Sequence, residues 1–177
     1  MSTIQNKIVA NFWFDQQAED AAKFYTTVFK HSKMGKISYY GEEGREITQK
    51  MPGTVMQVEF WLEGQRFTAL NGGPQFKFNE ALSLAINCSN QHEIDHYWNK
   101  LTEEGDPGSQ QCGWLKDKFG VSWQVVPEKL ADWMSDREQE KSGRVMKALL
   151  QMKKIDLNQL KKAYDGSEEK KRKPDYA

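Results

Sequence analysis

The stretch ALNGGPQFKFNEALSL, residues Ala69–Leu84, decides the fold because it joins two halves of the chain that repeat one order of elements. It contains the end of one predicted strand, a Gly-Gly-Pro break and the start of another strand. Phe76 and Phe78 alternate with polar residues in the linker between the halves. We expect these two rings to pin the linker down or to plug the mouth of a cavity.

The half that precedes this stretch begins with a predicted strand at residues 7–15. Asp15 then offers an N-cap for a helix. The apolar residues of that helix recur three and four positions apart, as expected for a helix that lies on a sheet. They are Ala18, Ala21, Ala22, Tyr25, Val28 and Phe29.

Three further strands are predicted before the break, at residues 35–41, 54–63 and 65–71. The last two form a hairpin with a tight turn. The strand at 54–63 alternates clearly between its two faces. One face carries Val58, Phe60 and Leu62, and the other carries Gln57, Glu59 and Trp61. We expect the first face to pack on the helix and the second to line a concave surface.

The half that follows the break restarts the same order. Residues 81–88 are a predicted strand, and Asn90 with Glu93 forms a capping box. A helix is predicted next, with Gly105 at its end. Its apolar stripe is Ile94, Tyr97, Trp98 and Leu101.

A second hairpin is predicted from residues 111–117 and 121–127, with its turn at Phe119-Gly120. A shift of 73 residues superposes the apolar positions of the two helices, and a shift of 56 superposes the two hairpins. This agreement indicates an internal duplication of a β-α-β-β-β module.

The predicted organisation is therefore a duplicated domain at residues 1–127, with module 1 at about 7–73 and module 2 at about 81–127. A helical extension is predicted at 128–165, followed by a charged tail at 166–177. The three apolar stripes of the extension need a surface to cover. That surface could belong to the same domain or to a dimer partner, and the sequence leaves both open.

Composition excludes several classes of function. The 25 basic and 25 acidic residues cancel, so no long-range field favours nucleic acid or an anionic membrane. No apolar run approaches the roughly 20 residues that span a bilayer. The N-terminal residues contain no apolar secretion signal, and Cys88 and Cys112 are interpreted as free thiols. We therefore expect a cytoplasmic protein.

Four segments carry a resemblance to a known family. They are FWFDQQAEDAAKFY (12–25), VEFWLEGQRFTALNGGPQFKFNEALSL (58–84), QCGWLKDKFGVSWQVVP (111–127) and VMKALLQMKKIDL (145–157). The chain resembles the vicinal-oxygen-chelate superfamily, which includes glyoxalase I, bleomycin-resistance proteins and extradiol dioxygenases. Within it, the chain is similar to the PhnB-like branch, often labelled 3-demethylubiquinone-9 3-methyltransferase.

This resemblance implies an α+β fold of two βαβββ modules that form paired half-open mixed sheets. Each sheet would curl into a cup with its helix on the convex side, and the protein would be a homodimer. The methyltransferase label does not imply a matching activity. Gly72-Gly73-Pro74 leads into an extended linker. A common S-adenosylmethionine site would need a Gly-rich loop between a strand and a helix.

The resemblance also implies a divalent metal held by residues of the first and last strands of each module. Counting from the helix aromatics places these positions near Ala10, Thr68, Ser83 and Gln124. Zinc, iron and nickel prefer imidazole, carboxylate or thiolate ligands. Of the four residues only Gln124 could bind a metal, and weakly, so we expect neither a metal nor another cofactor.

Residues 92–96, HEIDH, match the H-E-x-x-H motif of zinc proteases. A helix turns by about 100° per residue. This angle places His92 and His96 opposite the apolar stripe of their helix. We interpret them as surface histidines.

Glu59 is the best catalytic candidate, because a desolvated glutamate can act as a general base. The alternative for Glu59 is an ion pair with Arg66 on the neighbouring strand. Gln124 is the polar candidate on the last strand of the second module. Asn71 could bind a ligand or could stabilise the turn before the two glycines. Cys112 is interpreted as an inert thiol.

Phe12, Trp61 and Trp114 could form the aromatic wall of a small-molecule cleft, or they could pack in the core or a dimer interface. The function we expect is binding of a small molecule in the concave cleft without a metal. The alternative is an enzyme of the same superfamily that acts on a small metabolite. A third interpretation is an interaction module whose cleft is filled by its own side chains.

Overall fold

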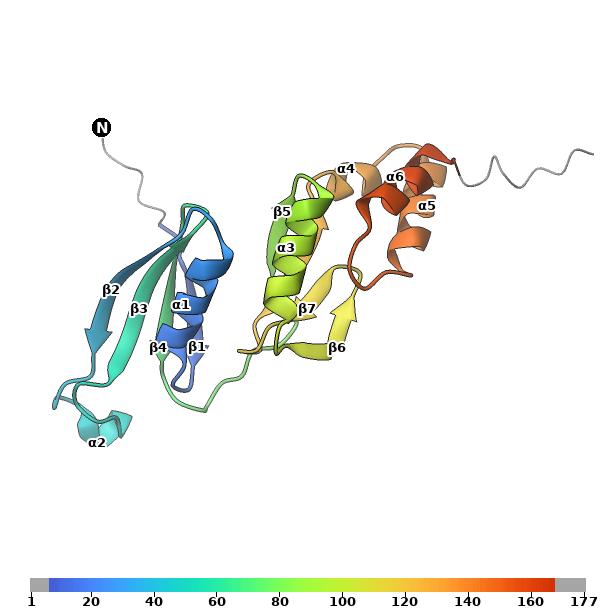
Figure 1. The fold of residues 1–177 in the computed structure, drawn as a ribbon. Coiled ribbons are helices and arrows are strands. Elements are labelled where there is room, and N and C mark those ends of the chain that lie inside the picture. The colour runs from blue at the N-terminus through green and yellow to red at the C-terminus, as the bar shows by residue number, and fades with distance from the viewer. Residues whose placement is uncertain (1–6, 168–177) are drawn as a thin grey trace, which may run out of the picture. The chain divides into compact units, whose positions relative to one another are not determined.

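The computed structural model describes residues 7–167. It divides into two compact units, one ending at Phe78 and the other beginning at Asn79. The helices and strands of both units are labelled in Figure 1, and each unit is described by itself.

The first unit contains four strands and two helices. They are β1 (Ala10–Phe14), α1 (Ala18–Val28), β2 (Lys33–Tyr39), α2 (Arg45–Thr48), β3 (Val55–Leu62) and β4 (Gln65–Asn71). The second unit contains β5 (Leu84–Cys88), α3 (Gln91–Thr102), β6 (Asp106–Gln111), β7 (Trp114–Lys116), β8 (Ser122–Pro127), α4 (Leu130–Met134), α5 (Gln139–Leu149) and α6 (Leu157–Asp165).

The two sheets have the same topology. The strand order is β1-β4-β3-β2 in the first sheet and β5-β8-β7-β6 in the second. In each sheet the first strand pairs with the last in parallel, and the other pairings are antiparallel. Equal order and equal strand directions confirm the two βαβββ modules of the predicted α+β fold.

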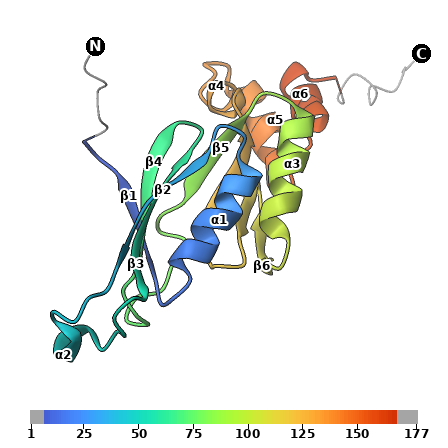
Figure 2. The same cartoon turned by 60° about the vertical axis from the view of Figure 1, so that its left-hand side comes forward.

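Helix α1 covers one face of the first sheet, as Figure 2 shows. Every residue of its apolar stripe is buried, as predicted from the spacing. Val58, Phe60 and Leu62 of β3 are also buried. The ring of Tyr25 on α1 stacks on that of Phe60 with centroids 6.3 Å apart. The alternation of β3 therefore assigned its faces correctly.

The linker after β4 wraps around the edge strand β1. Phe78 packs on the ring of Phe14 at 5.1 Å, on the side of the sheet that α1 covers. Phe76 packs on Trp13 at 5.0 Å, on the opposite side. The two rings therefore pin the linker to both faces of one strand, which confirms the structural role that their alternation suggested.

Gly72 is required where this linker begins. A Cβ on Gly72 would lie 2.5 Å from Cη2 of Trp13, well inside van der Waals contact. The indole nitrogen of Trp13 also donates a hydrogen bond to the carbonyl of Gly73 at 2.8 Å. The Gly-Gly pair thus lets the backbone lie flat against an indole ring.

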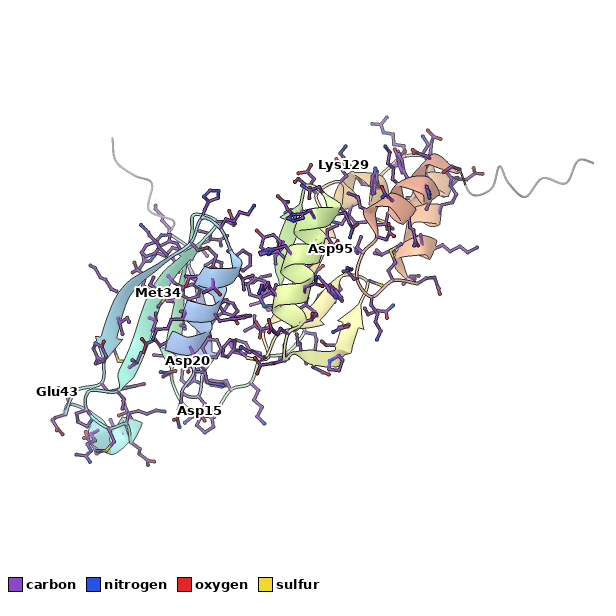
Figure 3. All side chains as sticks on the ribbon, viewed as in Figure 1. Asp15, Asp20, Met34, Glu43, Asp95 and Lys129 are labelled. Carbon is purple, nitrogen blue, oxygen red and sulfur yellow. The ribbon has the colours of Figure 1, made fainter. Side chains whose placement is uncertain are left out.

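Two local predictions in the helices need correction. Gln17, rather than Asp15, occupies the N-cap position of α1, and its side chain makes no capping hydrogen bond. Asp15 lies in the turn before the helix (Figure 3). Helix α3 ends at Thr102, and Glu104, with a φ of 59°, adopts the left-handed conformation that was expected of Gly105. The N-cap role of Asn90 is confirmed, because its side chain accepts the amide of Glu93, and the Glu93 carboxylate in turn accepts the amide of Ser89.

The second hairpin also differs from its prediction. Residues 106–111 form a separate strand, β6, and Cys112 with Gly113 forms the turn into β7. Both turn residues have positive φ, as two-residue hairpin turns require. Pro107 and Gly108 conceal β6 in the sequence because both residues disfavour strands.

The helical extension packs on the second unit of its own chain. The amides of Cys112 and Gly113 each donate a 2.8 Å hydrogen bond, to the carbonyls of Met152 and Lys153 respectively. Gln91, at the start of α3, donates to the carbonyl of Ile155 at 3.1 Å. Asp95, labelled in Figure 3, forms an ion pair with Lys154 at 2.6 Å. Packing within the chain is therefore the arrangement observed for this segment.

Helix α6 begins as predicted, because the side chain of Asp156 accepts the amide of Gln159 at 2.9 Å. Most of the charged tail, from residue 168 onward, lies outside the described residues. No helix within residues 7–167 is long and apolar enough to cross a membrane.

Candidate functional site

The face of the first sheet opposite α1 carries two of the candidate residues, Glu59 and Trp61, and we call it the second face. Its residues form rows across the strands, because directly paired residues of neighbouring strands point the same way. One row is Lys33, Trp61 and Arg66, on β2, β3 and β4. The next row is Glu59, Thr68 and Asn11, on β3, β4 and β1.

Trp61 is held in place by the backbone of β2. A Cβ on Gly35 would lie 2.5 Å from Cζ3 of this indole, so only glycine lets the ring lie there. The ammonium of Lys33 lies 4.7 Å from the ring centroid, within the range of a cation–π contact. Trp61 is half-buried and thus presents part of its ring on the second face.

Glu59 and Arg66 form an ion pair on the same face. Oε2 of Glu59 lies 3.0 Å from Nη2 of Arg66, and the two side chains are 19% and 29% exposed. The alternative that we gave for Glu59, a pair with Arg66, is therefore present. The Nε atom of Arg66 is buried and has no hydrogen-bond partner. Such an orphaned donor is uncommon, because buried polar groups are normally paired.

The positions at which the resemblance implies metal ligands hold neutral pairs. In the first sheet, the hydroxyl of Thr68 donates to Oδ1 of Asn11 at 2.7 Å. The expected first-strand position was Ala10, but Ala10 pairs with the buried Phe67, and the register places Asn11 beside Thr68. Our count was therefore wrong by one residue.

The second sheet contains a similar neutral pair, although Ala85, and not Ser83, is the direct cross-strand partner of Gln124. The side-chain amide of Gln124 on β8 donates to the hydroxyl of Ser83 at 2.8 Å. Trp114 on β7 is the direct cross-strand partner of Gln124, so the two candidates share one face of this sheet. Trp114 occupies the register position in β7 that Glu59 occupies in β3.

These residues do not fit a divalent transition metal. Their polar groups are amides and hydroxyls, which are weak ligands for such metals. In each pair, the two side chains are already hydrogen-bonded to one another. Residues 7–167 contain no group of three His, Cys, Asp or Glu side chains that could hold a metal ion. Within the HEIDH motif, His92 is exposed and Glu93 bonds back to Ser89 at the helix cap.

Phe12 does not share a face with Trp61. Its ring stacks on that of Phe67 at 5.7 Å and meets that of Tyr25 on α1 at 6.3 Å. It is one of the buried side chains of the core. The core-packing alternative therefore holds for Phe12, because its strand position points it toward α1.

Asn71 also has a structural place. It is 7% exposed. Its Oδ1 accepts the amide of Ala18 at 2.8 Å, and its Nδ2 donates to the carbonyl of Val55 at 3.0 Å. The side chain of Asn71 therefore supplies the cap that α1 lacks locally.

The two thiols differ in environment. Cys88 is fully buried in β5, and this burial raises the pKa of its thiol from 9.0 to about 12. Cys112 lies in the turn between β6 and β7 and is half-buried. A thiol with so high a pKa carries almost no thiolate near neutral pH, so Cys88 is not a nucleophile.

Sequence reasoning missed Lys33 and Gly35 as parts of this face. The strand predicted at 35–41 begins two residues before that, at Lys33, and is irregular between Met34 and Ile37. The irregularity breaks the alternation that would have assigned Lys33 to a face. Arg66 was already named as the alternative partner of Glu59, and its alternation with the buried Phe67 agrees with that position.

Comparison with known proteins places this geometry in a family. A family model described as 3-demethylubiquinone-9 3-methyltransferase matches residues 6–126. The solved structure of the PhnB protein from Bacillus cereus is 36% identical, with a TM-score of 0.58 and coverage of 69% of this chain and 98% of that chain. The protein PA1353 from Pseudomonas aeruginosa is 18% identical, with a TM-score of 0.53 and coverage of 70% and 97%, and supports the fold alone. No curated protein matches the chain.

The fold is that of two repeated βαβββ modules, and each sheet carries one neutral pair near the expected metal positions. The chain belongs to the family described as 3-demethylubiquinone-9 3-methyltransferase. The resemblance to the PhnB-like branch is thereby confirmed.

Proposed function

We propose that this protein binds a small aromatic or amphipathic molecule on the second face of its first sheet, without the metal of its superfamily. The observation that carries the proposal is Trp61, a half-buried indole seated on Gly35 beside the Glu59–Arg66 ion pair. Sites for small molecules combine aromatic surface with a few placed polar groups.

The proposal that no metal takes part follows from donor chemistry. Amide and hydroxyl oxygens occupy the positions where imidazole or carboxylate would be needed. A molecule bound on this face would therefore be held by stacking, hydrogen bonds and ion pairing with the protein itself.

Catalysis on a small metabolite is the alternative function. It would need a group that moves a proton, and Glu59 is the carboxylate in the two rows that hold the candidate residues. The ion pair with Arg66 engages Oε2 of Glu59, so Glu59 would have to leave this pair before it could accept a proton from a bound molecule. A variant Glu59→Gln that keeps binding but abolishes a turnover found by screening would establish the enzyme.

The test is a screen of small aromatic compounds by ligand-observed NMR on EDTA-dialysed protein. We expect binders whose signals change with the wild type and are lost with Trp61→Leu. Tyr39→Leu is the matched control, because Tyr39 is an exposed ring on β2 of the same sheet. Absence of any binder, or equal binding by Trp61→Leu, would reject the proposal. Stoichiometric metal that survives dialysis would reject its metal-free part.

We also propose the homodimer that the family resemblance implies. Light scattering during gel filtration should then give twice the 20.5 kDa of one chain. A mass of one chain at micromolar concentration would exclude a stable dimer.

A further inference from the structure

We propose that the row Lys33–Trp61–Arg66 selects anionic aromatic molecules, with the ring of the ligand on Trp61 and its acid group on Arg66. This inference rests on the proposed function, because it names the class of molecule that the same face binds.

The charge of the second face favours an anion. The chain as a whole has a net charge of zero. The row Lys33–Trp61–Arg66 and its neighbour Glu59 contain two cations and one carboxylate, so this part of the face has an excess of positive charge. An anion placed there gains attraction from both cations, and the half-buried position of Arg66 limits screening by water.

The guanidinium of Arg66 has incomplete hydrogen bonding. Its pair with Glu59 uses Nη2, and Nε is buried without a partner. A side-on contact with an oxyanion engages Nε and Nη2 together, since these two N–H groups point the same way. Glu59 makes only half of that contact. An incoming carboxylate or phosphate would give Arg66 the full pair, at the cost of its bond to Glu59.

The position of the Trp61 indole favours a ligand that is both aromatic and anionic. Trp61 is the direct cross-strand partner of both Lys33 and Arg66, so its position on β3 lies between those of the two cations. Gly35 fixes the ring against β2. Lys33 is exposed and only rests on the ring, so it can turn toward a bound anion. A flat ligand with an acid group at one end matches this order of groups.

The experiment is isothermal titration of the dialysed 177-residue chain with four probes. The probes are 2-naphthoate, 2-naphthyl phosphate, the neutral 2-naphthylmethanol, and cyclohexanecarboxylate, which has the acid but no aromatic ring. We expect at least one of the two naphthyl anions to bind tenfold or more tightly than the alcohol and than cyclohexanecarboxylate. The two anions together show whether a carboxylate or a phosphate is preferred.

Three variants assign this preference to the row. Arg66→Met should weaken the preferred anion at least tenfold, and the exposed Lys33→Gln about threefold, because ion pairs at partly exposed sites are modest. Glu59→Gln should tighten it, because Arg66 loses its competing partner. Arg45→Met removes an exposed, ion-paired arginine on α2 and should change nothing.

The outcomes distinguish a failure of the anion preference from a failure of small-molecule binding itself. Affinities of both naphthyl anions equal to that of naphthylmethanol would overturn the anion preference and leave small-molecule binding intact. Weaker binding by Glu59→Gln would overturn the role of Arg66. Binding of none of the four probes would overturn the inference, and the compound screen would then decide the proposed function on its own.

Discussion

Replacing Asn71 with alanine should destabilise the first unit more than any other single-amide change on its sheet. The substitution leaves the amide of Ala18 without its acceptor and the carbonyl of Val55 without its donor. Loss of an N-cap costs about 0.5–2 kcal/mol. A buried group left without a partner costs about 1–3 kcal/mol. Because Asn71 is only 7% exposed, water cannot replace these bonds, and we expect a total of about 2–4 kcal/mol.

The assay is urea denaturation followed by far-ultraviolet circular dichroism, together with amide hydrogen exchange at Ala18. The control is Asn79→Ala, in which an exposed asparagine loses one local bond to the amide of Ala81 at 3.0 Å. It should cost less than about 0.5 kcal/mol, as exposed substitutions usually do. If Asn71→Ala changed stability as little as the control, or left the exchange of Ala18 unchanged, the capping role would be wrong.

Three further predictions follow from single contacts. Gly72→Ala forces a Cβ into the ring of Trp13 and should cost about 1–3 kcal/mol in urea denaturation, whereas Gly143→Ala in α5, with open space around it, should be neutral or stabilising. The buried thiol of Cys88 should resist Ellman's reagent in folded protein at pH 8 and react after denaturation, because burial raises its pKa to about 12; rapid labelling of a Cys112→Ser variant in the folded state would refute this. The hydroxyl of Tyr164 donates to Asp136 at 2.5 Å and lowers the pKa of that carboxyl. Since the folded pKa lies below the unfolded one, this bond stabilises the extension above the ordinary pKa of 3.8 and the stabilisation is lost as the pH falls through the lowered value. Tyr164→Phe should therefore lower the melting temperature at pH 7 and not at pH 2, and an equal effect at both would contradict the pairing.

The parts of the fold that follow from periodicity were predictable. The stripe of α1 and the alternation of β3 each depend only on neighbouring residues, and both assignments are correct. The capping residues Asn90 and Asp156 were predictable for the same reason, since each bonds an amide three residues later.

The parts that depend on distant residues were not predictable. Asn71 caps a helix that begins 53 residues earlier, and no local pattern records such a bond. Strand β6 carries Pro107 and Gly108, so pairing with β7 overrides its weak propensity. The first-strand position beside Thr68 was predicted near Ala10, but it is Asn11. A one-residue error in counting along a strand places a side chain on the wrong face of the sheet.

The measurement that tests metal-free binding most directly is the affinity of the preferred naphthyl anion for EDTA-dialysed protein, with and without added Mn²⁺, Fe²⁺ or Zn²⁺. Asn11, Thr68, Ser83 and Gln124 offer neutral donors that are already paired, so the dissociation constant should be the same within about twofold in each case. Binding that is absent after dialysis and restored by one of these metals would contradict the account.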